Sequence, residues 1–205
     1  MKVLGITGGV GSGKSEVLKY LEEHYGAVIC QMDETARQIQ RKGTECFRQI
    51  VEAFGEEITD ENGELNRAAL GACVFSDPEK LKTLNEIVHP EVIRRVRREI
   101  EKSEASGAAL YVLEAALLPE VGRELCDELW YIYTSEAVRR QRLKMSRHYT
   151  DEKITNMIAS QPSEEDFRRS CTAVIDNSGT FENTKRQIGD RLDNENVQHC
   201  KRQQR

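Results

Sequence analysis

The segment Gly8–Ser15, which reads GGVGSGKS, constrains the fold of this chain more than any other feature. It matches GxxxxGK[ST], the pattern of a glycine-rich loop that binds phosphate, with the glycines, the lysine and the serine in register. The apolar run Val3–Ile6 precedes it and a helical pattern over Glu16–Glu23 follows. A glycine-rich turn with a surface lysine would explain the glycines alone. The matched order of strand, loop and helix favours a phosphate-binding loop instead.

The residue types in the loop suit a triphosphate. Gly8, Gly11 and Gly13 permit backbone angles that a side chain would forbid, so that successive N–H groups turn inward around an anion. Lys14 supplies a point charge for the β- and γ-phosphates, and the Ser15 hydroxyl suits Mg²⁺. The dipole of the following helix also favours phosphate. We therefore expect ATP contacts from Gly11, Ser12, Gly13, Lys14, Ser15 and Glu16.

Short apolar runs alternate with longer helical patterns, an order typical of βαβ units and a parallel sheet. The run Ala109–Leu113 is nearly all apolar, as in a strand that is buried on both faces. At 205 residues the chain has room for one α/β core with small insertions, and not for two large domains. The expected strands are Val3–Thr7, Ala27–Met32, Ala109–Leu113, Leu129–Thr134 and Ala173–Asp176.

The second and third expected strands are separated by about 75 residues, far more than one crossover helix needs. We expect several helices there, forming an insertion suited to substrate binding. The segment Asp60–Gly63, DENG, fits a DxxG pattern of GTPases. It lies in a polar loop rather than at a strand end, and no NKxD accompanies it, so we interpret it as a turn. The expected helices are Asp33–Gln40, Thr44–Phe54, Asn66–Val74, Pro78–Ile87 and Pro90–Ala105.

The segment Glu136–Thr150 is rich in basic residues. Such a run is usually the solvated face of a helix. Beside a phosphate loop, however, a mobile arginine-bearing segment supplies cations for phosphoryl transfer and excludes water. We therefore expect at least one of its arginines to act in a lid. The basic residues of the segment are Arg139, Arg140, Arg142, Lys144 and Arg147.

Two carboxylates stand at the ends of expected strands, where parallel sheets place their ligands. Asp33 suits either the acceptance of a hydroxyl proton near the γ-phosphate or the N-cap of a helix. Glu114 suits either a water-mediated contact with Mg²⁺ or the simple termination of a strand. Position alone leaves both pairs of alternatives open.

Composition argues against several other classes of protein. The formal net charge of −5 does not favour nucleic acid or an anionic membrane, and no apolar run approaches the ~20 residues that span a bilayer. The N-terminus lacks the pattern of a signal peptide. The six cysteines show neither a CxxC pair nor zinc spacing, so we expect reduced thiols in a cytoplasmic protein. The polar segment 193–205 is expected to be disordered or a frayed helix.

Over residues 1–192, the chain resembles the dephospho-CoA kinase family, in motifs that follow one another in order. The phosphate loop is shared by many families, but the His89-Pro90 pair, the DxxAR segment and the VIxN ending are together specific. The matching segments are Gly5–Ser15, Asp33–Arg37, Lys42–Gly55, Gly63–Leu70, Val74–Phe75, Leu84–Val92, Ala116–Glu120, Arg142–Leu143, Gln161 and Val174–Gly179.

The resemblance implies ATP-dependent phosphorylation of the ribose 3′-hydroxyl of dephospho-CoA, the last step of coenzyme A synthesis. It implies an α/β fold like that of nucleoside monophosphate kinases, with five parallel strands, a helical insertion and a small lid. The expected parts are a core of 1–32, 106–135 and 151–192, a CoA-binding domain of 33–105, a lid of 136–150 and a tail of 193–205. The alternative is another small-metabolite or nucleotide kinase of the same architecture.

The resemblance also assigns roles by position. Asp33 becomes the general base and, with Lys14 and Arg142, a catalytic residue. Asn177 falls on the adenine side of ATP. The residues expected on the substrate side are Arg37, His89 and Arg147.

The chain departs from the family pattern at several positions. Where the family has DAD, this chain has Gln31, Met32 and Asp33, so the first carboxylate is lost and the second is kept. Glu16 replaces a common threonine, which removes a hydroxyl from the α-phosphate side. The lid carries one extra residue between its arginines, which makes Arg142 the firmer assignment and Arg147 the weaker one.

Overall fold

A computed structural model describes residues 1–116, 118 and 122–202, with side chains described up to residue 193. The described chain forms two compact units. Unit 1 comprises Met1–Ile29 and Ala109–Arg205, and unit 2 comprises Cys30–Ala108. The boundary between the units lies within a strand, β2.

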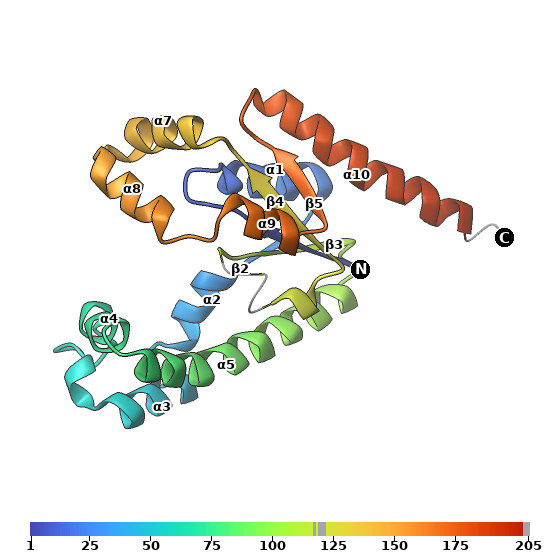
Figure 1. Ribbon diagram of the computed structural model, residues 1–205. Coiled ribbons are helices and arrows are strands. Elements are labelled where there is room, and N and C mark those ends of the chain that lie inside the picture. Colours follow the sequence, from blue (N-terminus) through green and yellow to red (C-terminus); the bar gives the residue numbers. More distant parts are fainter. Residues whose placement is uncertain (117, 119–121, 203–205) are drawn as a thin grey trace. The chain divides into compact units, whose positions relative to one another are not determined.

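The sheet has five strands in the order β2-β3-β1-β4-β5, which confirms the expected α/β fold (Figure 1). Each expected strand is present to within about one residue at most ends. β1 runs parallel to β3 and β4, and β4 runs parallel to β5. In this register Ile6 lies beside both Glu114 and Trp130, so that β1 and β3 end side by side where the phosphate loop begins, while β4 continues to Tyr133. The strands are β1 (Lys2–Thr7), β2 (Val28–Gln31), β3 (Leu110–Glu114), β4 (Glu128–Tyr133) and β5 (Ala173–Asp176).

Alternation along the strands divides the buried side chains between two faces of the sheet. On one face, Leu4, Ile6 and Trp130 join a cluster with residues of α1 (Lys14–Tyr25) and α10 (Phe181–Arg202). On the other, Tyr131 of β4 stacks on Phe167 of α9 with ring centroids 4.8 Å apart. The remaining elements of unit 1 are η2 (Arg123–Leu125), α7 (Glu136–Arg147), α8 (Asp151–Ala159) and α9 (Glu164–Ser170).

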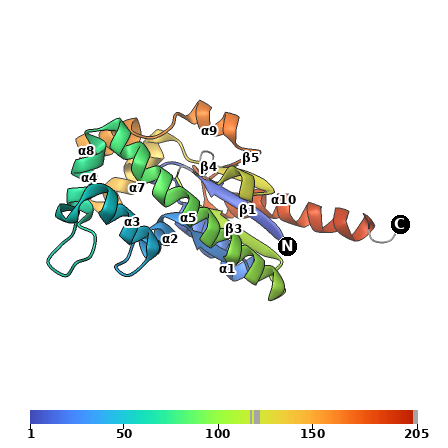
Figure 2. The same cartoon turned by 90° about the horizontal axis from the view of Figure 1, so that it is seen from below.

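The helix α10 continues well beyond its packed part. Its apolar residues Ile188 and Leu192 are buried in the cluster, and the helix then extends past the strands to Arg202 (Figures 1 and 2). The polar segment from residue 193 was expected to be disordered or a frayed helix. As far as residue 202 it is helical, because it prolongs a helix that packing has already nucleated.

Unit 2 is made of helices, and three of them begin at a side-chain cap. Thr44, Asn66 and Asp77 each accept a hydrogen bond from a backbone N–H of the first turn that follows. Such caps satisfy donors that have no partner within the helix. The elements of unit 2 are α2 (Met32–Ile39), α3 (Glu45–Phe54), η1 (Glu56–Ile58), α4 (Arg67–Phe75) and α5 (Pro78–Ala105).

The expected break near Pro90 is wrong, because α5 is one helix from Pro78 to Ala105 with Pro90 inside it. Val88, Val92 and Val96 recur every four residues on both sides of the proline, and all three are buried. In unit 2 this stripe packs α5 against α2, α3 and α4. The packing of a continuous apolar face outweighs the local preference of proline to end a helix.

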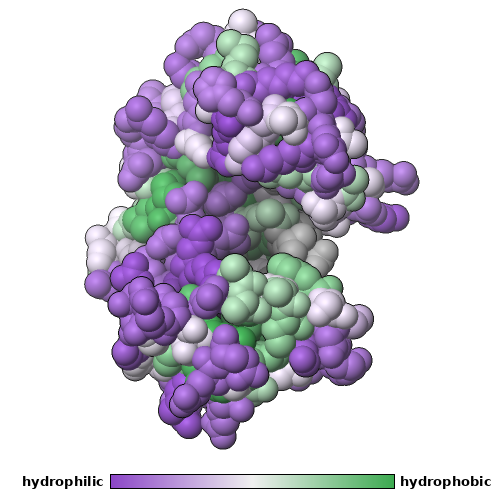
Figure 3. Space-filling view, turned by 90° about the vertical axis from the view of Figure 1, so that its left-hand side faces the viewer, coloured by the Kyte–Doolittle hydropathy of each residue, from purple (hydrophilic) through white to green (hydrophobic). Residues whose placement is uncertain are grey.

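Hydrophilic residues cover most of the face drawn in Figure 3, as expected of a chain in which 32% of residues are charged. The cysteines whose side chains are described, Cys30, Cys46, Cys73, Cys126 and Cys171, form no disulfide. In the described part of the chain, no helix has both the length and the apolar character needed to cross a membrane.

Candidate active site

The predicted phosphate loop connects β1 to α1 and adopts a conformation that needs its glycines. Gly11 and Gly13 have φ angles of 77° and 85°, in the left-handed region that favours glycine. A Cβ on Gly13 would also collide with the side-chain amide of Asn177. Gly13 is the N-cap of α1 and has no side chain with which to cap it, so the helix N-terminus is left for an anion.

Three side chains from distant elements hold the carbonyl of Ser12. Its oxygen accepts hydrogen bonds from Thr134 Oγ1 at 3.0 Å, Asn177 Nδ2 at 2.8 Å and Arg142 Nη1 at 3.4 Å. In a planar trans peptide the C=O and the following N–H point in opposite directions. Fixing the Ser12 carbonyl on one side therefore aims the N–H of Gly13 to the other side of the loop.

Lys14 is held against the loop and against a buried carboxylate. Its Nζ donates to the carbonyl of Gly8 at 2.8 Å and lies 3.6 Å from Glu114 Oε1. Glu114, at the end of β3, is only 8% exposed. The ammonium offsets the cost of burying this carboxylate, and the carboxylate fixes the position of the ammonium. Both groups therefore stand where the sequence expected them, at the phosphate loop.

The lid segment meets the loop through Arg139 and Arg142 of α7. Arg142 Nη2 donates to the carbonyl of Asn177 at 2.9 Å, and Arg139 Nε donates to the carbonyl of Val10 at 2.8 Å. Arg147, in the last turn of α7, is exposed instead. The structure thus brings Arg142 to the loop and leaves Arg147 in solvent.

Asn177 is 1% exposed and its amide is engaged at both ends. The Nδ2 group donates to Ser12, and Oδ1 accepts from Thr184 Oγ1 at 2.8 Å. The backbone N–H of Asn177 donates to the carbonyl of Tyr133 at 2.8 Å. This side chain holds the phosphate loop, whereas its expected contact with ATP stays a prediction.

In unit 2, Asp33 is the second residue of α2 and its side chain is exposed. The N-cap of α2 is Gln31, so the alternative role of Asp33 as a helix cap is wrong. Among the described residues, Asp33 has no hydrogen-bond or ion-pair partner. One turn further along, Arg37 is exposed and pairs with Glu34 at 3.5 Å. The Asp33 carboxylate is therefore available to a substrate.

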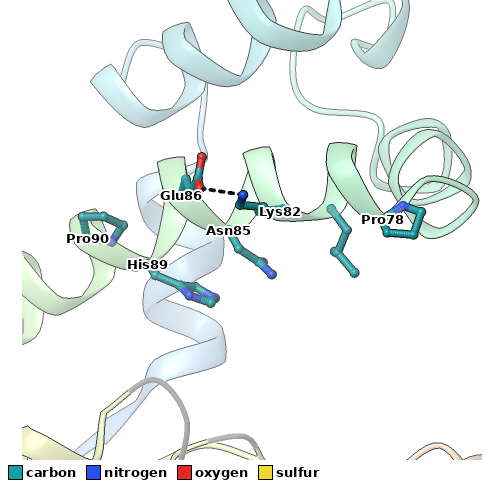
Figure 4. Close-up of a pocket in the computed structure, with 7 residues that line it drawn as sticks. Pro78, Lys82, Asn85, Glu86, His89 and Pro90 are labelled. Carbon is teal, nitrogen blue, oxygen red and sulfur yellow. Dashed lines mark ion pairs between the residues drawn. The ribbon is translucent and has the colours of Figure 1, made fainter.

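His89 lies where two shallow grooves along α5 adjoin. One groove, of about 490 Å³, includes Asn85 and His89, which point to the same side of the helix in Figure 4. The other, of about 630 Å³, includes His89, Arg97 and Arg98. His89 is partly buried, so it is placed to line a binding surface of unit 2.

Sequence reasoning missed the roles of Arg139, Gln161, Thr134 and Thr184. Thr134 and Ser12 are 122 residues apart in sequence, and Arg139 and Val10 are 129 apart. No local pattern marks such pairs, because a threonine after a strand or an arginine on a helix is common. Gln161 stood in the list of matching motifs, which was the one available signal.

The oxygen donors near the loop fit Mg²⁺. Ser15, exposed in the first turn of α1, offers a hydroxyl, and Glu114 offers a carboxylate. Among the described residues, no group of three or more His, Cys, Asp or Glu side chains is placed to hold a metal. Mg²⁺ does not require one, because it is usually bound by one or two protein oxygens together with substrate phosphates and water.

Comparisons with known proteins point to one family. A family model described as dephospho-CoA kinase matches residues 2–183. The dephospho-CoA kinase of Geobacillus kaustophilus is 40% identical over 187 residues, covering 90% of this chain and 92% of that protein. The dephospho-CoA kinase of Carboxydothermus hydrogenoformans is 38% identical over 190 residues, covering 92% and 91%. A solved structure from Thermus thermophilus superposes with a TM-score of 0.80 at 31% identity, covering 94% and 97%.

Proposed function

The chain belongs to the dephospho-CoA kinase family, and from this premise we propose how its residues divide the work of the reaction. It is an enzyme that transfers the γ-phosphate of ATP to the ribose 3′-hydroxyl of dephospho-CoA, giving coenzyme A and ADP. The observation that carries the donor half is the phosphate loop, in which the carbonyl of Ser12 is held by Thr134, Asn177 and Arg142.

The donor half binds the triphosphate of ATP. The backbone N–H groups of residues 11–16 surround the phosphates, and Lys14 contributes its charge to the β- and γ-phosphates. Arg142, held beside Ser12, adds a second cation as negative charge spreads over the transferred phosphoryl group. Mg²⁺, held by the Ser15 hydroxyl and through water by Glu114, would neutralise charge on the β- and γ-oxygens.

The acceptor half is assigned to unit 2, with Asp33 as the general base. As the 3′-oxygen forms its bond to the γ-phosphorus, the bond from that phosphorus to the bridging oxygen of ADP breaks. The hydroxyl proton passes to the Asp33 carboxylate. Support comes from the exposed position of Asp33 in the first turn of α2, with no partner among the described residues.

Substrate binding is assigned to Arg37 and His89 of unit 2 and to Arg147 at the end of α7. Residues 33–105 then form the CoA-binding domain, and residues 136–150 form the lid. Support comes from the independent compactness of Cys30–Ala108 and from the grooves that adjoin at His89. We also propose a cytoplasmic enzyme with ATP and dephospho-CoA as its ligands. The net charge of −5 argues against nucleic acid or an anionic membrane as a further partner.

An assay that couples ADP release to a chromogenic reaction tests the function across a panel of acceptors. We expect turnover with dephospho-CoA and only background rates with nucleoside monophosphates or shikimate. Turnover with one of the latter, and none with dephospho-CoA, would contradict the assignment and favour a related small-metabolite kinase.

A further inference from the structure

Two side chains from outside the phosphate loop hold both backbone groups of Val10. Gln161 Oε1 accepts a hydrogen bond from Val10 N–H at 3.0 Å, and Arg139 Nε donates to the Val10 carbonyl at 2.8 Å. The two side chains are also joined, because Arg139 Nη2 donates to the same Gln161 Oε1 at 2.8 Å. We call this closed ring of Val10, Arg139 and Gln161 the Val10 clamp.

The clamp sets the orientation of two peptide planes in the loop. Because the peptide is planar and trans, holding the Val10 carbonyl on the clamp side turns the Gly11 N–H to the opposite side. In the preceding plane, holding the Val10 N–H turns the Gly9 carbonyl away, and this carbonyl accepts from Ser12 N–H at 3.2 Å. Gly11 is the first of the predicted phosphate donors, so the clamp aims the start of the phosphate cradle.

Gly9 makes room for the clamp. A Cβ placed on Gly9 would lie 2.5 Å from Arg139 Nη2 and 2.6 Å from its Cζ, so the guanidinium lies directly on the Gly9 backbone. Burial lowers the pKa of Arg139, as desolvation does for a cation. The Arg139 guanidinium is half-buried and held by two hydrogen bonds, so it cannot move aside without breaking them. A side chain at position 9 would therefore disturb the clamp.

We propose that Arg139 and Gln161 are positioning residues, which act through Val10 to preset the Gly11 N–H for the phosphates of ATP. The proposal rests on the proposed function, in which this loop binds ATP. In this proposal α7 has two roles. It carries Arg142, and through Arg139 it fixes the conformation of the phosphate loop before ATP binds. Gln161 is the centre of the device because a single oxygen receives both hydrogen bonds.

The test is the Gln161→Met variant, which keeps the length of the side chain and removes its acceptor. Losing hydrogen bonds to a charged partner and to the loop backbone is expected to raise the Kd for a non-hydrolysable ATP analogue about tenfold. Titration calorimetry measures this Kd without any acceptor substrate. In steady-state assays, KM for ATP is expected to rise in parallel while KM for dephospho-CoA stays within about twofold.

Three further variants separate positioning from a general loss of structure. Gln161→Glu keeps an acceptor for both donors, so it is expected to bind the analogue within about threefold of the parent. Gly9→Ala displaces the Arg139 guanidinium without changing either clamp side chain, so it is expected to weaken the analogue as Gln161→Met does. Arg140→Met, on the same helix, removes contacts to Glu136 and Thr155 and is expected to leave the Kd unchanged.

The proposal is overturned if Gln161→Met binds the analogue like the parent, if Gln161→Glu loses as much affinity as Gln161→Met, or if Arg140→Met loses as much as either. If Gln161→Met does not fold, Gly9→Ala with Gln161→Glu decides in the same way. A failure of the proposed function is distinguishable from these outcomes, because it would appear as an absence of turnover of dephospho-CoA by the unaltered enzyme.

Discussion

At the scale of single residues, Asp33 carries the proposed acceptor chemistry. Asp33→Asn keeps the size of the side chain and removes the base, so kcat is expected to fall by orders of magnitude while KM for ATP changes little. Steady-state kinetics with dephospho-CoA measure both. Glu79→Gln is a matched control, because Glu79 is also an exposed acid at the second position of a helix in unit 2. Full turnover by Asp33→Asn would remove Asp33 as the base.

A second prediction at this scale concerns Gly13 and its contact with Asn177. Gly13→Ala would force a Cβ into the Asn177 amide and place alanine at a φ of 85°. Because the Asn177 amide holds the Ser12 carbonyl, we expect loss of measurable ATP binding, together with destabilisation of about 1–3 kcal/mol.

Gly26→Ala is the control for Gly13→Ala. Gly26 also has a positive φ, 62°, but nothing lies within 4 Å of the position its Cβ would take. It is expected to cost about 1 kcal/mol and to leave ATP binding unchanged. Urea unfolding and calorimetry measure the two effects. Equal losses of ATP binding in the two variants would show that backbone strain, and not the contact with Asn177, is responsible.

At the scale of elements, α5 contains two prolines, one at its first position and one in its interior. Pro90 interrupts the hydrogen bond that residue 90 would donate to the Glu86 carbonyl, whereas Pro78 stands at the first position of the helix, where no such bond exists. Pro90→Ala restores the donor and is expected to raise the free energy of unfolding by about 1–2 kcal/mol. Urea denaturation followed by circular dichroism measures it.

Pro78→Ala is expected to change the free energy of unfolding in the opposite direction. It gains no hydrogen bond and makes the unfolded chain more flexible, so it is expected to lower the free energy of unfolding by up to about 1 kcal/mol. If Pro90→Ala destabilises the protein as Pro78→Ala does, the prediction is wrong. The packing of the Pro90 ring would then stabilise the protein by more than the missing hydrogen bond destabilises it.

The same elements show what the sequence could and could not predict. The strands followed from short apolar runs, because burial on both faces leaves a local signature that any window detects. The phosphate loop, Lys14 and Glu114 followed from a motif and from strand ends. The break at Pro90 was wrong, since the valine stripe that overrides it acts through helices elsewhere in unit 2.

The Val10 clamp and the three donors to the Ser12 carbonyl could not be predicted from the sequence, because they too depend on contacts between distant parts of the chain. Each joins residues more than 120 positions apart, and each uses a residue type that is common on any surface. Their importance depends on which carbonyl they reach, and that is decided only when the sheet places α7 and the residues after β5 beside the loop.

At the scale of the whole molecule, desolvated thiols and phenols in both units tie stability to alkaline pH. Burial raises the pKa of Cys126 to about 12 and that of Cys46 and of Cys171 to about 11, from an ordinary value of 9.0. Burial, followed by the charge of Asp193, also raises the pKa of Tyr25 to about 12 from 10.0. All four groups stay protonated in the native state at a pH where they ionise in the unfolded chain.

The free energy of unfolding is therefore expected to fall as pH rises from 9 toward 12. In this interval the unfolded chain binds fewer protons than the native state, so the derivative of the unfolding free energy with pH is negative. Well below pH 9 the thiols are protonated in both states and contribute no slope. Urea unfolding at a series of pH values measures the dependence.

Cys126→Ala isolates one contribution to this slope. Removal of the buried sulfur costs the variant some packing energy, and this part of the change does not depend on pH. Its unfolding free energy should then decline less steeply with pH than that of the parent, since one proton-binding difference is gone. Parallel slopes for the two proteins would mean that the Cys126 thiol ionises alike in the folded and unfolded chains, and that its burial does not shelter it from solvent.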